Sequence, residues 1–120
     1  MKHLFFYLSI SFILMHEMDA IRCKEWRIFP LLSMLNDDLG FKVFILAHIP
    51  LFTLLFIGLN QANNEDLIKG LNIFFIIHLG LHVLFLFNKK NEFKDWLSWI
   101  IISGAALFGL LDLIKMSIFI

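Results

Sequence analysis

Four histidines give this sequence its clearest chemical signal. His16, His48, His78 and His82 lie inside or at the ends of strongly apolar blocks. Neutral imidazole is the commonest metal ligand among side chains. His78 and His82 are four residues apart, so on a helix their rings share one face. This spacing is a weak motif by itself, but it predicts metal ligands on one helix, with His16 and His48 as candidates to complete the set.

Two carboxylates follow the first histidine directly. Glu17 and Asp19 lie within three residues of His16, and either is a candidate ligand or general base in a metal-centred reaction. Three or four imidazoles with a carboxylate favour Zn²⁺ or non-haem iron over Ca²⁺ or Mg²⁺. Asn91 and Glu92, which follow the third apolar block, are expected to orient the ligands from a second layer.

The composition indicates a membrane environment for these residues. The chain has 120 residues, of which 60% are hydrophobic and 15 are Phe, and its mean hydropathy is +0.84. Soluble domains are about 45–50% apolar, and a chain of this size has little interior in which to bury the excess. The formal net charge is zero, which gives no electrostatic reason to expect nucleic-acid binding. A single cysteine excludes an intrachain disulfide.

Charged residues divide the chain into four apolar blocks. Residues 43–64 and 70–88 contain no Asp, Glu, Lys or Arg, and both approach or exceed the roughly 20 residues that a spanning helix needs. The first block reads alternatively as a signal peptide, but it lacks the small-residue cleavage pattern. We therefore expect an all-α, integral membrane four-helix bundle forming a single transmembrane domain over 1–120, with a short interfacial segment between the first two helices. The expected helices cover about 3–22, 42–60, 68–88 and 96–117.

Lysine and arginine placement predicts the orientation. The two segments after the first and third helices hold seven basic residues: Arg22, Lys24, Arg27, Lys42, Lys89, Lys90 and Lys94. The opposite side holds three, which are Lys2, Lys69 and Lys115. By the positive-inside rule, both basic segments face the cytoplasm. The expected location is a bacterial inner membrane with both termini in the periplasm.

A depth count brings the histidines together. With a rise of about 1.5 Å per residue, His16 and His48 lie about 9 Å, and His82 about 10 Å, inside the cytoplasmic boundary. His78 lies one turn deeper on the same face as His82. Because ionisable groups in a membrane usually face a bundle interior, the count predicts a His/carboxylate cluster in the cytoplasmic half of the bundle.

The remaining polar residues are expected to be structural. His3 is expected at the membrane interface on the other side, and Asp112 with Lys115 near the lipid interface. Ala105 and Gly109 form a small-xxx-small face that suits helix packing. The fourth helix has no histidine, so it either closes the bundle or contacts a second copy or a membrane partner. The residues expected to be solvated loop charges are Glu25, Arg27, Asp37 and Asp38.

Three functions fit this pattern. The first is a transition-metal site, catalytic on a lipid or small hydrophobic substrate, with His16, His48, His78 and His82 as ligands. The second is a proton-coupled or solute-binding transport or accessory protein without metal. The third is a structural partner subunit, in which the histidines only hold helices together.

Several segments resemble an uncharacterised family of small bacterial four-span membrane proteins. They are "HEMDAIRCKEWRIFP", "VFILAHIPLF", "HLGLH" and "NEF", and the family pattern includes H-E-x-D-A-x-R followed by E-W. The resemblance implies a bacterial membrane location but no mechanism, because the family's activity is unknown. The residues matched to the pattern are His16, Glu17, Asp19, Ala20, Arg22, Glu25, Trp26, His48, Pro50, His78, His82, Asn91, Glu92 and Phe93.

Overall fold

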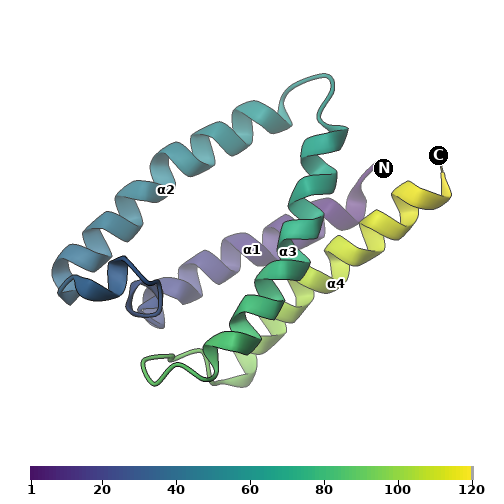
Figure 1. Ribbon diagram of the computed structural model, residues 1–120. Helices are drawn as coiled ribbons and strands as arrows, with labels where there is room; N and C mark the ends of the chain where they lie inside the picture. The colour runs from purple at the N-terminus through teal and green to yellow at the C-terminus, as the bar shows by residue number, and fades with distance from the viewer. Residues whose placement is uncertain (120) are drawn as a thin grey trace.

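The computed structural model describes residues 1–119 and contains four long α-helices (Figure 1). Each helix is long and apolar enough to cross a membrane, and no strand occurs in the described part of the chain. This confirms the expected all-α fold with four membrane-capable helices. The elements are α1 (Leu4–Arg22), the 3₁₀ helices η1 (Glu25–Arg27) and η2 (Leu32–Met34), α2 (Asp37–Leu59), α3 (Glu65–Phe85) and α4 (Trp96–Ile118).

Helix capping explains where α2 and α4 begin. The Asn36 side chain accepts a hydrogen bond from the Leu39 amide at 2.9 Å, and Asp95 accepts one from the Ser98 amide at 2.9 Å. Such caps satisfy amides that a helix N-terminus leaves unpaired. The expected start of α2 near residue 42 is therefore five residues too late, because the apolar block marks the membrane segment and not the helix end.

Helix α3 is shifted by about three residues at both ends from the expected 68–88. Its first turn contains Glu65 and Asp66, which interact favourably with the positive end of the helix dipole. The helix ends at Phe85, and residues 86–95 form the turn and loop that lead to α4. That loop carries Asn91 and Phe93 back against the bundle, where both are buried.

Small residues let α4 pack closely along α1 and α3. The Ser9 hydroxyl donates a 2.5 Å hydrogen bond to the Ala105 carbonyl. A Cβ atom on Gly109 would lie 3.2 Å from the Asn72 carbonyl oxygen. The face formed by Ala105 and Gly109 is thus buried within the chain itself, where it allows close helix approach.

Helix α2 stands away from the other three over most of its length (Figure 1). Its only buried residues are Gly40 and Phe44, both near its N-terminal end. The indole of Trp26 packs there, with its ring centroid 5.9 Å from that of Phe44. A Cβ atom on Gly40 would lie only 2.6 Å from the indole. The glycine therefore allows Trp26 to anchor α2 to the η1 segment.

A second polar group lies toward the end of the bundle that carries both chain termini. Asp112 on α4 is only 1% exposed. It accepts a hydrogen bond from the side-chain amide nitrogen (Nδ2) of Asn72 at 3.0 Å, and its carboxylate lies 3.2 Å from His3 Nδ1. Asp112 is thus buried between the helices, and its contacts with His3 and Asn72 join α1, α3 and α4.

Candidate metal centre

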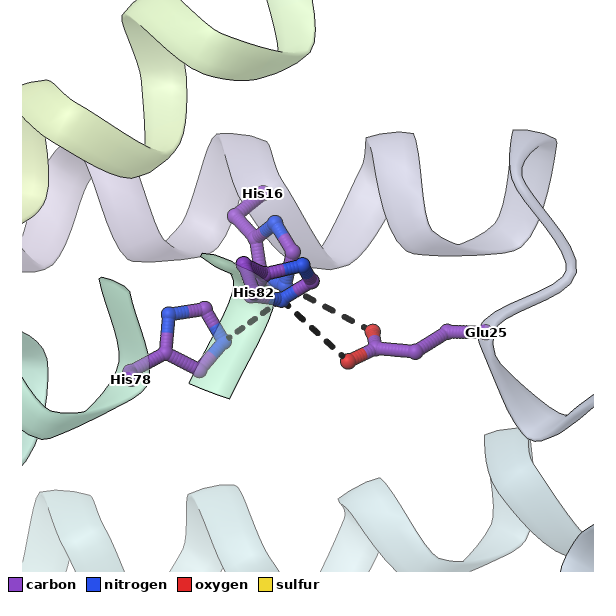
Figure 2. A group of neighbouring side chains, drawn as sticks. All are labelled: His16, Glu25, His78 and His82. Atoms are coloured by element: carbon purple, nitrogen blue, oxygen red, sulfur yellow. Dashed lines mark hydrogen bonds and ion pairs between the residues drawn. The ribbon is translucent and has the colours of Figure 1, made fainter. Parts of the chain in front are cut away.

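Four side chains converge where α1, η1 and α3 meet: His16, Glu25, His78 and His82 (Figure 2). Each offers one ligand atom, and all four atoms lie within 4.8 Å of one another. Three of the four predicted histidine ligands are therefore brought together by the fold. The fourth member of the group is a glutamate that the sequence does not single out as a ligand.

The distances within this group suit a tetrahedral ion. The Nε2 atoms of His78 and His82 are 3.2 Å apart. The Glu25 carboxylate oxygens lie 3.5 Å from His16 Nε2 and 3.7 Å from His82 Nε2. Ligand atoms at about 2.0–2.1 Å from a tetrahedral zinc ion are about 3.3–3.4 Å from one another. Small side-chain shifts would therefore place all four donors around one ion.

The group is largely shielded from solvent. His16, Glu25 and His82 are buried, whereas His78 is only partly buried. Both ring nitrogens of His16, and Nδ1 of His78 and of His82, have no hydrogen-bond partner among residues 1–119. Buried polar atoms normally have a partner, since an unsatisfied one costs about 1–3 kcal/mol. A bound cation would give lone pairs in this group such a partner.

Glu25 reaches the histidines because the chain turns sharply after α1. Lys24 adopts a left-handed backbone conformation with φ 50°, and the η1 turn directs Glu25 back toward α3 (Figure 2). Its side chain is buried, with an exposed residue fraction of only 4%. The expectation that Glu25 is a solvated loop charge is therefore wrong. The sequence signal that could have singled it out is the E-W pair of the family pattern, to which Glu25 is matched.

Aromatic rings hold the imidazoles in place. The Phe93 ring stacks on His16 with centroids 5.4 Å apart and meets His82 edge-on at 4.6 Å. Phe85 also contacts His82 edge-on at 5.4 Å. Metal-bound histidines are more usually oriented by a carboxylate or carbonyl. Here packing against phenylalanines restricts the ring orientations instead.

His48 lies outside the group because α2 stands apart. Its Nε2 is 2.7 Å from the Glu17 carboxylate, and its Nδ1 donates a 2.6 Å hydrogen bond to the Phe44 carbonyl. The depth count predicts His48 at the same level as His16 and His82, but the structure pairs it with Glu17 instead of the other histidines.

Asp19 has partners on the other side of α1. Its carboxylate accepts hydrogen bonds from Arg22 Nε at 2.7 Å and from the Ser98 hydroxyl at 2.5 Å. Arg22 also forms an ion pair with Asp95 at 3.0 Å. In the structure Asp19 thus connects α1 to the start of α4, whereas the sequence suggests it as a ligand or general base.

Asn91 and Glu92, the two residues expected to orient the ligands, make contacts in different parts of the structure. Asn91 is buried, and its side-chain oxygen accepts a 3.2 Å hydrogen bond from the Phe93 amide. It therefore holds the residue whose ring packs on His16 and His82. Glu92 lies 3.6 Å from Arg27 in an exposed ion pair between the two loops at this end of the molecule.

An apolar cleft opens beside the group, between α2 and α3, with α1 also contributing to its lining. Its volume is about 640 Å³. Four polar side chains line it: His78 and Glu25 of the group, and the paired Glu17 and His48. Pockets of about 300–1,000 Å³ with mostly apolar walls and a few polar groups are typical of small-molecule sites.

The buried position of Cys23, the single cysteine, makes its thiol poorly reactive. Burial, and then the nearby Asp19 carboxylate, raise the pKa of the Cys23 thiol to about 11, and Cys23 is 3% exposed. Because the thiolate is the nucleophile, a pKa of about 11 instead of 9.0 lowers the thiolate fraction at neutral pH by roughly 100-fold. Labelling of native Cys23 is therefore a poor measure of membrane orientation.

The chain belongs to a family of unknown function, DUF6713, whose model matches residues 2–118. The match covers all four helices and every residue of the candidate metal centre. It confirms the resemblance to an uncharacterised family. No curated protein and no solved structure matches this chain.

Proposed function

We propose that this protein binds one transition-metal ion through His16, Glu25, His78 and His82. The observation that carries the proposal is the meeting of four ligand atoms, from three separate elements, within 4.8 Å of one another. Histidines that only held helices together would be expected to pair with hydroxyls or carbonyls, as His48 does with Phe44. Instead, their nearest polar neighbours are each other and Glu25.

The donor set favours Zn²⁺ or non-haem iron. Imidazole nitrogen suits zinc and iron, whereas Ca²⁺ and Mg²⁺ prefer sites composed of oxygen ligands. One carboxylate among three neutral imidazoles leaves a bound divalent ion with one uncompensated positive charge. For such a centre to activate water or polarise a carbonyl group of a substrate, that molecule would have to enter as a fifth ligand or displace one of the four protein donors. The adjacent cleft suits a lipid or small hydrophobic substrate, with Glu17 near enough to the cleft to act as a base.

Elemental analysis of the purified protein tests the proposal. Protein reconstituted in lipid nanodiscs with zinc or ferrous iron, then freed of unbound metal, is expected to retain about one equivalent per chain. The His48→Ala variant, which removes a membrane histidine outside the group, is expected to retain the same amount. Wild-type protein that retains no stoichiometric metal under either condition would overturn the proposal.

We further propose a bacterial inner-membrane location with both termini in the periplasm. The two basic loops lie at one end of the molecule, and the termini lie at the other (Figure 1). A contact between Arg27 and Glu92 at 3.6 Å joins those loops. The seven basic residues on that side support a cytoplasmic position.

Engineered cysteines should report this orientation where Cys23 cannot. In a Cys23→Ala background, Lys90→Cys lies in an exposed basic loop and Ala62→Cys in the exposed loop between α2 and α3. An impermeant maleimide added to intact cells is expected to label Ala62→Cys and to leave Lys90→Cys unlabelled until the cells are opened. The reverse labelling pattern would place the termini in the cytoplasm. Wild-type Cys23 is expected to react only after denaturation.

A further inference from the structure

The cleft between α2 and α3 shares two residues with the candidate metal centre. His78 and Glu25 both line the cleft and belong to the four-residue group. His16 and His82 complete the group without lining the cleft. A molecule bound in the cleft would therefore meet the metal centre on the side of His78 and Glu25.

The walls of the cleft are mostly apolar, and they come chiefly from α2, α3 and the segment between α1 and α2. Leu51 and Ala47 on α2 face Phe74, Leu81 and Phe85 on α3, and residues 29–32 of the connecting segment add further apolar side chains. The buried residues of α2 all lie near its N-terminal end, so most of its apolar surface is exposed. In a membrane, the bilayer would surround that surface and the cleft between α2 and α3. An acyl chain is the abundant apolar molecule in that environment.

The polar end of the cleft favours a negatively charged group once a metal is bound. Glu17 is already paired with His48 at 2.7 Å. The ionised Glu25 balances only one of the two charges of a divalent ion, so one positive charge remains. A carboxylate carries one negative charge, which matches this excess, and it could approach the ion as an additional ligand beyond the four protein donors.

We propose that the cleft binds a long-chain fatty acid, with the acyl chain between α2 and α3 and the carboxylate directed to the metal centre. This inference rests on the proposed metal site for its charge, whereas the apolar part of the site does not need the metal. The volume of about 640 Å³ is in the range of a site for one small molecule. It suits a single acyl chain better than a complete two-chain phospholipid.

A photoreactive palmitate that carries a diazirine in its chain tests the site in nanodiscs. Zinc-loaded wild-type protein is expected to be labelled on peptides of α2 and α3, and excess palmitate should abolish that labelling. The Leu51→Trp variant fills the cleft and is expected to lose most of the labelling. Leu54→Trp is the matched control, because this exposed residue on the same helix does not line the cleft.

The charge argument is tested by competition. Palmitate should displace the probe from zinc-loaded protein at a concentration at least about tenfold lower than hexadecanol, since only the carboxylate carries a charge opposite to that of the metal centre. The His82→Ala variant disrupts the group without touching the cleft wall. In this variant, the preference for palmitate should disappear while labelling of α2 and α3 persists.

The experiments give different results depending on whether the fatty-acid site or the metal site is wrong. If the protein binds zinc, but Leu51→Trp and Leu54→Trp are labelled equally or hexadecanol competes as well as palmitate, the fatty-acid site is wrong and the metal centre stands. If no metal is retained, elemental analysis shows this without the probe. Cleft labelling that shows no preference for palmitate in metal-free protein would then identify a site for apolar chains only, and the proposed anionic ligand would be wrong.

Discussion

The His82→Ala variant is expected to bind zinc more than about 100-fold more weakly than wild-type protein. Loss of a group that merely orients a metal ligand typically costs about 10–100-fold in affinity, and loss of a ligand should exceed that range. His82 is the central member of the group, because its Nε2 contacts His78 Nε2 at 3.2 Å and Glu25 at 3.7 Å. Without it, His78 cannot share an ion with Glu25 in the same geometry.

Competition with a chromophoric chelator measures this loss directly. His48→Ala provides the matched control, since it removes an imidazole at the same expected depth from a helix that stands apart. We expect that control to keep its zinc affinity within about threefold, well below the 10-fold lower limit for an orienting partner. Equal weakening by His48→Ala and His82→Ala would contradict the four-residue centre and return His48 to the ligand set.

The Glu25→Gln variant tests the effect of the negative charge of Glu25 separately from the effect of its shape. Glutamine keeps an oxygen donor and nearly the same volume, but it removes the charge that offsets a divalent ion. We expect zinc affinity to fall by more than about tenfold, with the thermal unfolding midpoint of the metal-free protein unchanged or raised. A variant with unchanged zinc affinity would show that Glu25 neighbours the ion without binding it.

Asp19→Ala is expected to lower the stability of the folded protein by about 3 kcal/mol. The carboxylate accepts hydrogen bonds from Ser98 at 2.5 Å and from Arg22 at 2.7 Å, and each hydrogen bond to a charged group contributes about 1.5–3 kcal/mol. Arg22 can still interact with Asp95 at 3.0 Å, which limits the loss. Removing the carboxylate therefore weakens the connection between α1 and the start of α4.

Thermal unfolding in nanodiscs measures this effect, with Asp38→Ala as the control. Asp38 is an exposed acid whose one ion pair joins it to Lys42 on the same helix at 2.6 Å, and such pairs contribute about 0.3–0.5 kcal/mol. A shift of about 10 °C for Asp19→Ala and of 2 °C or less for Asp38→Ala is expected. If Asp19→Ala instead keeps its stability and loses zinc, Asp19 belongs to the metal site after all.

The sequence predicts the helices well because their causes are local. Apolar length indicates a spanning segment, and capping residues such as Asn36 and Asp95 mark where helices begin. The cap at Asn36 lies six residues before the expected start of α2, so it marks the true beginning of that helix. The spacing of His78 and His82 likewise requires only helix geometry, so their shared face follows from the sequence alone.

The sequence by itself predicts how deep each polar residue lies along its helix, and it places His16, His48 and His82 at one level with His78 one turn deeper. It does not determine the direction in which each side chain points around the helix axis, or how far apart the helices stand. Those depend on contacts between distant segments, such as Trp26 against Gly40. For that reason only the tertiary structure separates His48, which pairs with Glu17, from the group, and brings Glu25 into it through the turn after α1.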